Sequence, residues 1–242
     1  MPSDLSHTTI GALGKWITAR HLTPDAIAAA HRAFNGRDER YVVLDDIMDP
    51  ARLAQIRHLI QEEGEVRTAY KLYTESGWVD GDRFVQAPDE ERFIHEHIYT
   101  GPKPGHAMSQ PTLHDRLFRM FVGSRPFADF LSAITGLGIG ALQNVNLKRL
   151  NADHFLRWHS DRSPGRALCM VIYLHDDWQP AYDGRLLMQR ADGNGIDRID
   201  PLFNRLVVFS PNVSTQHAVE PLSPAAAGWS RLNYSLWFSE PA

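Results

Sequence analysis

The stretch HFLRWHSDRSPGR, residues 154–166, decides the expected fold and chemistry of this chain. Its first half alternates like a β-strand, in which every second side chain projects to the same face. His159 and Asp161 are two residues apart, so such a strand places both of them on one face. That arrangement is typical of two ligands of a metal ion, and a third ligand has to come from elsewhere in the chain.

The best candidate for the third ligand is His217, in the segment STQHAVEPL at 214–222. Two histidines and one carboxylate occupy one triangular face of an octahedral ion, and the opposite face stays free for water, dioxygen and a chelating substrate. The pattern therefore predicts an open, catalytic iron site with His159, Asp161 and His217 as its ligands.

The last strand-like segment, SRLNYSLWF at 230–238, carries an unusual charge. Alternation places Arg231, Asn233, Ser235 and Trp237 on one face and four apolar residues on the other. Burying a guanidinium is costly unless an anion meets it, and its planar fork of donors suits a carboxylate. Arg231 is therefore expected to bind a small dicarboxylate, with a structural ion pair to Asp or Glu as the alternative.

The two halves of the chain differ in character. Residues 24–34, 50–63, 111–121 and 125–135 have helical spacing of apolar residues, with Gly64 and Gly136 expected to cap the second and last of these helices. After residue 140 the sequence consists of short strand-like runs separated by Gly, Pro, Asp and Asn. This predicts a mainly β, α+β fold: a jelly roll over 140–240, buttressed by helices in 1–139, as one catalytic domain over 1–242.

Residues 70–108 show no sustained periodicity. A long irregular segment in a compact domain is often a lid or a binding loop, so this segment is expected to cover the substrate. For His95-Glu96-His97 within it, we favour an edge strand that faces solvent or substrate over a metal pair, because no third ligand lies at a recognisable spacing. His154 and the segment HDDWQPAYDG at 175–184 lie near the motif, and the latter is expected to be a solvated loop.

Composition excludes several classes of partner. The net charge of −4 and pI near 6.3 provide no general attraction to nucleic acid or to an anionic membrane. No segment approaches about 18 uninterrupted apolar residues, and the first residues do not form a secretory signal, so a soluble cytoplasmic protein is expected. Cys169 is the only cysteine, which excludes an intrachain disulfide and favours a small buried hydrophobe.

The ordered motifs of the second half resemble the iron(II)- and 2-oxoglutarate-dependent oxygenases, closest to the prolyl-4-hydroxylase-like branch. The resemblance covers about residues 140–240. It is carried by HSD at 159–161, the turn DGRLLM at 183–188, FNRLVVFSP at 203–211 and RLNYSLWF at 231–238.

The resemblance implies a double-stranded β-helix and a role for each motif residue. It makes His159, Asp161 and His217 the iron ligands. Arg231 would bind the distal carboxylate of 2-oxoglutarate, together with Tyr173 and with Asn233 on the same strand face. Two further arginines complete the expected site: Arg149 matches a tyrosine that faces the cosubstrate in some relatives, and Arg166 matches a residue near the substrate.

The predicted reaction is hydroxylation of an unactivated C–H bond in a small molecule, such as a free or peptidyl amino acid or a natural-product intermediate. The products would include succinate and CO2, with ascorbate as a supporting reductant. Asp161 favours hydroxylation over halogenation, because halogenating relatives replace that carboxylate with a small residue. Desaturation or ring formation at the same site, a cupin-type hydrolase or isomerase, and a non-catalytic sensor of iron or 2-oxoglutarate remain alternatives. The oligomeric state is not predicted.

Overall fold

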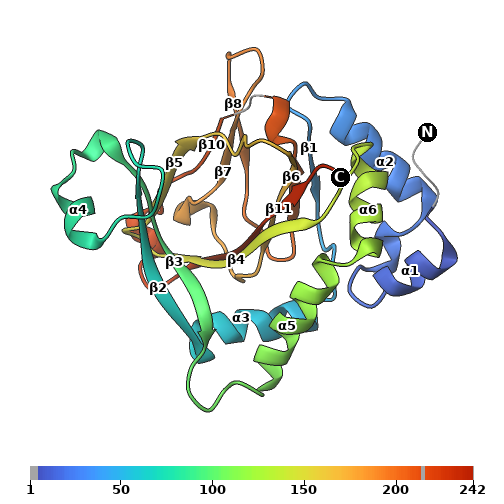
Figure 1. Cartoon of the computed structure of the whole chain (residues 1–242), viewed down its shortest axis with the longest axis horizontal. Coiled ribbons are helices and arrows are strands. Elements are labelled where there is room, and N and C mark those ends of the chain that lie inside the picture. Colours follow the sequence, from blue (N-terminus) through green and yellow to red (C-terminus); the bar gives the residue numbers. More distant parts are fainter. Residues whose placement is uncertain (1–4, 214–215, 242) are drawn as a thin grey trace.

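The computed structural model describes residues 5–213 and 216–241, which form a curled antiparallel sheet with helices on its outer side (Figure 1). The helices are α1 (His7–Leu13), α2 (Pro24–Asn35), α3 (Pro50–His58), α4 (Gly81–Gln86), α5 (Gln110–Val122) and α6 (Arg125–Thr135). The strands are β1 (Tyr41–Leu44), β2 (Gly64–Leu72), β3 (Arg92–Pro102), β4 (Leu142–Leu150), β5 (Phe155–His159), β6 (Arg166–Tyr173), β7 (Leu186–Gln189), β8 (Ile196–Ile199), β9 (Leu206–Phe209), β10 (His217–Val219) and β11 (Arg231–Ser239).

The strands follow the order β1-β9-β6-β11-β4-β3-β5-β10-β7-β8, and β2 pairs with β3 beside this path. Strand β3 has two successive partners. Its residues Ile94 and His95 pair with β5, while His97 and Ile98 pair with β4. The sheet therefore turns at β3, and the described strands form the double-stranded β-helix, or jelly roll, that the sequence predicts.

Strand β11 shows why the helices cover one face of this sheet. Leu232, Tyr234, Leu236 and Phe238 are buried in the same apolar core as side chains of α2, α5 and α6. The alternate residues of β11 face the interior of the curled sheet, as the alternation predicts. Figure 1 shows α1, α2 and α6 together on one side of the sheet and α3 and α5 along another.

The segment 70–108 differs from the expected irregular loop, because it contains the end of β2, from Tyr70 to Leu72, and all of β3. Only residues 73–91, with the short helix α4, connect the two strands. The long hairpin lacks a clear hydrophobic alternation because β2 has no regularly buried face: only Ala69 and Leu72 are buried, and its other residues are exposed or partly buried. Its order comes from backbone pairing. Strand β3 is also an internal strand of the sheet, and the prediction of an edge strand at 95–97 was wrong.

Gly64 lies at the expected end of the helical stretch, but it follows a π-helical turn and is extended rather than left-handed. Helix α3 ends at His58, a π-helical turn follows over Leu59–Glu63, and Gly64 opens β2 with extended backbone angles of φ −91° and ψ 142°. A Cβ atom here would lie 2.9 Å from the Leu59 carbonyl and 2.9 Å from the ring of Tyr99. Glycine is required by this close approach. Gly136, by contrast, ends α6 in the left-handed conformation at φ 77°, which confirms the other expected cap.

In the part of the chain that the structure describes, no helix combines the length and the apolar character needed to cross a membrane.

Candidate active site

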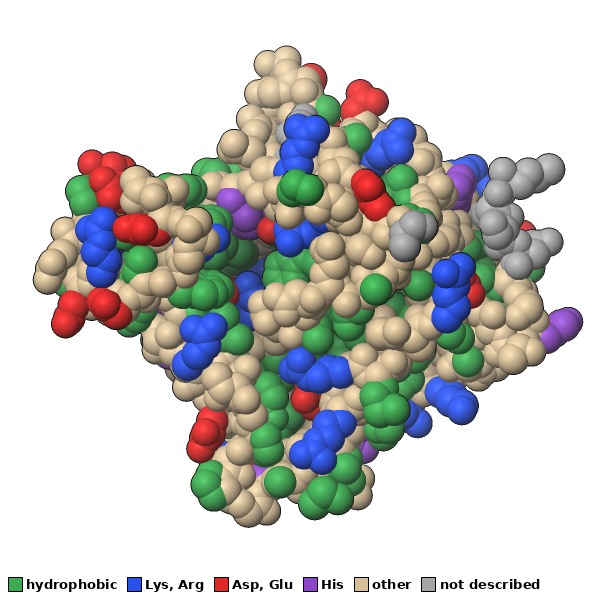
Figure 2. All heavy atoms as spheres, in the orientation of Figure 1, with side chains coloured by type: hydrophobic (Ala, Val, Ile, Leu, Met, Phe, Trp, Pro, Cys, Tyr) green, Lys and Arg blue, Asp and Glu red, His purple; other side chains and the backbone are tan. Residues whose placement is uncertain are grey.

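A central cavity of about 390 Å³ lies inside the curled sheet. Its walls come from β4, β6 and β11 on one side and from β5, β7 and β10 on the other. Residues Lys71, Trp78, Phe93, Ile94 and Glu96 of the segment 70–108 also line it. Figure 2 shows a hollow in the surface between the α4 region and the sheet, with apolar, basic and histidine side chains around it. The volume suits a small-molecule ligand.

The three predicted metal ligands meet in this cavity. His159 ends β5, Asp161 follows it by two residues, and His217 opens β10, which pairs with β5 so that the two histidines are directly opposite. Nε2 of His159 lies 3.8 Å from Oδ1 of Asp161, and Nε2 of His217 lies 3.5 Å from Oδ2 of Asp161. One donor atom of each residue lies within 4.8 Å of the others.

The protonation of these groups suits a metal. Nδ1 of His159 donates to the Arg157 carbonyl at 2.8 Å, which leaves the lone pair of Nε2 facing Asp161. Burial, and then the charge of His217, lowers the pKa of His159 to about 3, so its ring is neutral. Burial alone would raise the pKa of Asp161, but hydrogen bonding and charge from the two histidines lower it below its ordinary value. The arrangement offers two imidazoles and one carboxylate to a divalent ion, and it fits iron(II).

Trp237 holds the carboxylate of Asp161 from the other side. Its indole Nε1 donates to Oδ2 of Asp161 at 3.0 Å. The sequence places Trp237 on the inward face of β11 but gives no sign of this partner, because the hydrogen bond joins residues 76 positions apart. Arg166 lines the cavity near the same residue: it donates to the Asp161 carbonyl at 2.6 Å, and its guanidinium lies 5.7 Å from the centre of the Trp237 ring.

Arg231 lines the deep part of the cavity with only 2% of its surface exposed. Its Nε donates to the Gly184 carbonyl at 3.0 Å, one terminal nitrogen donates to Asn233 Oδ1 at 2.7 Å, and the other donates to the Tyr173 hydroxyl at 3.3 Å. Within 5–213 and 216–241, no carboxylate forms an ion pair with Arg231. Its three partners are neutral, so the buried positive charge is not compensated.

The expected position of Arg149 needs correction. Arg149 lies outside the central cavity, on the opposite face of β4, where it pairs with His97 of β3. Its neighbour Lys148 takes the inward position. Side chains on a strand alternate, so an error of one residue moves the expected contact to the wrong face. Lys148 forms a buried ion pair of 2.8 Å with Glu96, and neither residue was expected at the site.

His175 does not lie in a solvated loop. It is 1% exposed, Nδ1 accepts a 3.0 Å hydrogen bond from the backbone of Leu232, and Nε2 donates to the Pro201 carbonyl. His175 follows the end of β6 outside any helix or strand, so the expected loop is present, but a polar pattern in sequence does not reveal the backbone partners from distant strands that bury this ring. Asp176, one residue on, is half-exposed and pairs with Arg57 at 2.8 Å.

The fold and the geometry of this site define a non-haem iron oxygenase. Residues 145–239 match the family described as the 2OG-Fe(II) oxygenase superfamily. This match covers most of the β half of the chain, and the cofactors that it implies are iron(II) and the cosubstrate 2-oxoglutarate.

Solved structures with this fold support the assignment of the architecture. A prolyl-4-hydroxylase of Pseudomonas putida has a TM-score of 0.54 and 20% identity, with 89% of this chain and all of that chain covered. A prolyl hydroxylase of Trichoplax adhaerens, solved with a peptide of a hypoxia inducible factor, has a TM-score of 0.60 and 15% identity over 90% and 94% of the two chains. A 2OG-Fe(II) oxygenase family oxidoreductase of Burkholderia pseudomallei has a TM-score of 0.61 and 14% identity over 90% and 92%.

A comparison with curated protein sequences gives no match for this chain.

Proposed function

We infer that this oxygenase hydroxylates an unactivated C–H bond of an amino acid, either free or within a peptide. His159, Asp161 and His217 hold iron(II). Arg231, with Tyr173 and Asn233, holds the distal carboxylate of 2-oxoglutarate. The observation that carries this proposal is the buried charge of Arg231, which has only neutral partners and lies in the same cavity as the three metal-binding side chains.

The energetic argument is direct. Leaving a charge buried without a counter-ion costs several kcal/mol, on the order of 3–5 kcal/mol for a pair that has lost one member. A dicarboxylate bound in this cavity would relieve the cost at Arg231 with one end and leave its other end for the metal site. The neutral partners of Arg231 hold the guanidinium in place and leave its charge for the ligand. A metal site without a dicarboxylate cosubstrate would have no use for this arginine.

Bound iron(II) and 2-oxoglutarate together supply the activation of dioxygen, with release of succinate and CO2. The protein's own residues bind the metal and the cosubstrate and hold the metal ligands in position. The Arg157 carbonyl fixes the tautomer of His159, and Trp237 fixes the carboxylate of Asp161. Leu156, Leu186 and other apolar side chains line the cavity and limit the access of bulk water.

The charges around the cavity support an amino-acid substrate. Arg166 can meet a carboxylate, and Glu96, which pairs with Lys148 but has no hydrogen bond of good geometry, can meet an ammonium group. Lys71, Trp78 and Phe93 lie where the segment 70–108 covers the cavity, so we assign substrate contact to this segment as well. The whole chain then acts as one catalytic domain.

The test is an anaerobic titration of the iron(II)-loaded protein with 2-oxoglutarate, which should produce a visible metal-to-ligand charge-transfer band. The variant Arg231→Met should need about 30-fold more 2-oxoglutarate or still more for the same band, because the lost contact is a buried charge pair. Arg125→Met, at an exposed arginine of α6, is the matched control and should behave as the wild type. An equal requirement in all three proteins would place the cosubstrate elsewhere.

The substrate class is tested separately by succinate release in air with free amino acids and short peptides. Stimulation by at least one of these substrates, with a hydroxylated product, supports the proposal. If none stimulates release while the iron and 2-oxoglutarate band is normal, the proposed substrate class is wrong.

A further inference from the structure

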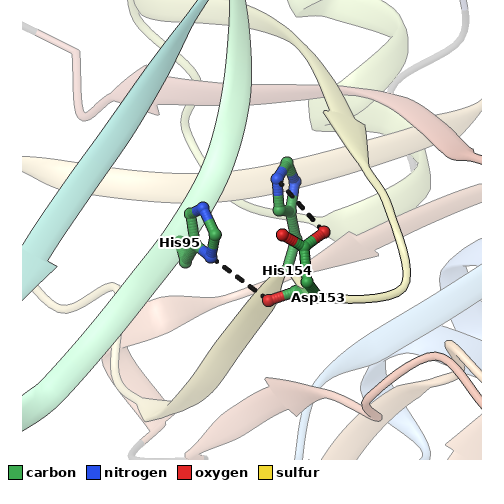
Figure 3. A group of neighbouring side chains, drawn as sticks. All are labelled: His95, Asp153 and His154. Atoms are coloured by element: carbon green, nitrogen blue, oxygen red, sulfur yellow. Dashed lines mark hydrogen bonds and ion pairs between the residues drawn. The ribbon is translucent and has the colours of Figure 1, made fainter. Parts of the chain in front are cut away.

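A second group of metal-binding side chains lies outside the central cavity. His95 projects from β3, and Asp153 and His154 come from the turn that precedes β5 (Figure 3). One donor atom from each of the three lies within 4.8 Å of the other two. The same limit holds for the group of His159, Asp161 and His217, the proposed iron ligands.

His154 is the side chain that needs a partner. It is 4% exposed, and its Nδ1 is buried without a hydrogen-bond partner. The Arg149 carbonyl lies near the ring but completes no hydrogen bond to it. Nε2 of His154 faces Oδ1 of Asp153 at 3.7 Å, which is too long for a hydrogen bond. Neither ring nitrogen of His154 therefore forms a hydrogen bond to a described residue, although buried polar atoms in folded proteins are nearly always satisfied, and Nε2, which faces Asp153, is free to bind an ion.

The other members of the group are arranged around this ring. The centre of the His95 ring lies 4.3 Å from that of His154, and the His97 ring lies 4.3 Å from it on another side. Nδ1 of His95 donates to the Asp153 carbonyl at 3.1 Å, which leaves the Nε2 lone pair of His95 free. Nδ1 of His97 is within hydrogen-bond distance of the Thr68 hydroxyl at 3.2 Å. His97 therefore packs against the site and is not one of its ligands.

The spacing is close to that of a bound ion. Zinc–nitrogen and zinc–oxygen bonds of about 2.0–2.2 Å place two tetrahedral ligand atoms roughly 3.3–3.5 Å apart. The 3.7 Å between His154 Nε2 and Asp153 Oδ1 exceeds this by a few tenths of an ångström. The 3.5 Å and 3.8 Å separations at Asp161 in the central cavity are similar. Small side-chain rotations complete either site.

We propose that His95, Asp153 and His154 form a second metal site, for zinc(II) or a similar borderline divalent ion, with water as the remaining ligand. Two imidazoles and a carboxylate suit zinc, and the exposed side chain of Asp153 leaves the site open to water. The ion would join β3 to the start of β5. These two strands share only the pairs Ile94–Leu156 and His95–Phe155, so an ion here would add a cross-link five residues before His159.

Two electrostatic effects on cation binding oppose each other at this site. Burial, followed by the charges of His95 and His97, lowers the pKa of His154 to about 4, so its ring is neutral and able to bind a cation near neutral pH. Arg149 lies close enough to lower the pKa of His97 after burial, and it opposes a cation at the same place. Asp153 offsets this charge. Removing the charge with Arg149→Met is therefore expected to tighten metal binding.

The test uses full-length protein that has been freed of metal by a chelator and then titrated with cobalt(II). Bound metal is counted by equilibrium dialysis, and the intense visible absorption of four-coordinate cobalt reports the second site. The wild type should bind two equivalents. Asp153→Asn and His95→Gln should each bind one, and Asp161→Ala should also bind one, at the second site. His7→Gln, an exposed histidine of α1, is the control and should bind two. Zinc should displace the cobalt that remains in Asp161→Ala.

Thermal unfolding provides a second measurement. Zinc should raise the unfolding midpoint of Asp161→Ala in proportion to the logarithm of its concentration, and adding Asp153→Asn should abolish this rise. The proposal is overturned if Asp161→Ala binds no cobalt, or if Asp153→Asn and His95→Gln bind as much cobalt as the wild type. A wild type that binds one equivalent, lost in His95→Gln but kept in Asp161→Ala, would support the second site and contradict the proposed iron ligands instead.

Discussion

Lys148 and Glu96 form an ion pair of 2.8 Å inside the central cavity, between strands β4 and β3. Glu96 is fully buried and Lys148 is 7% exposed. Neither carboxylate oxygen of Glu96 has a hydrogen bond of good geometry, so the contact is an ion pair by distance alone. Both charges of the pair are therefore buried, and the carboxylate oxygens of Glu96 remain able to accept hydrogen bonds from a substrate.

The stability of the protein should depend on both members of this pair together. Lys148→Met leaves the Glu96 carboxylate buried and unpaired, and should lower the free energy of unfolding by about 3–5 kcal/mol. Adding Glu96→Leu removes that charge and should recover most of the loss. Urea unfolding of the wild type, the two single variants and the double variant measures this. If the double variant were as unstable as the sum of the two single variants, the two side chains would not be coupled.

Trp237 should tune the affinity for iron. Trp237→Phe keeps a ring in place but removes the N–H that holds Asp161. Loss of such a partner of a ligand typically weakens metal binding by about 10–100-fold, which a competition titration with a chelator would measure. Trp229→Phe is a matched control, since its indole donates to the Asp176 carbonyl and not to Asp161. Equal affinities in both variants would mean that the hydrogen bond to Asp161 is unimportant.

Local pattern explains what could be predicted from the sequence. The alternation of β11 identifies Arg231 and its inward neighbours, and the spacing of His159 and Asp161 needs only a short strand. His217 follows from the order of the motifs. The helices at 24–34 and 125–135 also follow from local spacing, and the structure has them at Pro24–Asn35 and Arg125–Thr135.

The features that could not be predicted from the sequence depend on pairing between strands that are far apart in the chain. Glu96 reaches the cavity because β3 pairs with β4 and β5, which are about fifty residues away in sequence. The same pairing brings His95 to Asp153 and His154, although the sequence shows no third ligand near His95. The choice between Lys148 and Arg149 depended on which face of β4 points inward, and only the register with β11 and β3 decides this.

Gly184 should control the position of Arg231. It has φ +75°, and its carbonyl accepts a hydrogen bond from Arg231 Nε at 3.0 Å. In Gly184→Ala the new Cβ would lie 2.5 Å from Leu222 Cδ2, so either the Leu222 side chain or the turn has to shift, and the strain of alanine at this positive φ favours movement of the turn and its carbonyl. The expected result is a loss of stability of more than about 1–2 kcal/mol and a higher 2-oxoglutarate requirement, from urea unfolding and the anaerobic titration.

Gly193→Ala is the matched control for this effect. Gly193 has φ +73°, but a Cβ there meets nothing within 4 Å. It should therefore cost only the backbone strain, about 1–2 kcal/mol, and leave the 2-oxoglutarate requirement unchanged. If both variants changed the 2-oxoglutarate requirement equally, the Gly184 turn would not control the position of Arg231.

Acidification should destabilise the protein partly through His175. Burial, and then the charge of Arg231, lowers the pKa of this histidine from 6.5 to about 3. Its stabilising effect is complete above the unfolded pKa and is lost as pH falls towards 3, because only the unfolded chain takes up the proton in this range. One such group contributes a slope of about 1.4 kcal/mol per pH unit. In His175→Gln the free energy of unfolding should fall less steeply by about this amount, whereas the exposed His7→Gln should keep the wild-type slope. Urea unfolding at a series of pH values measures the slopes, and identical slopes in all three proteins would mean that His175 is protonated in the folded state.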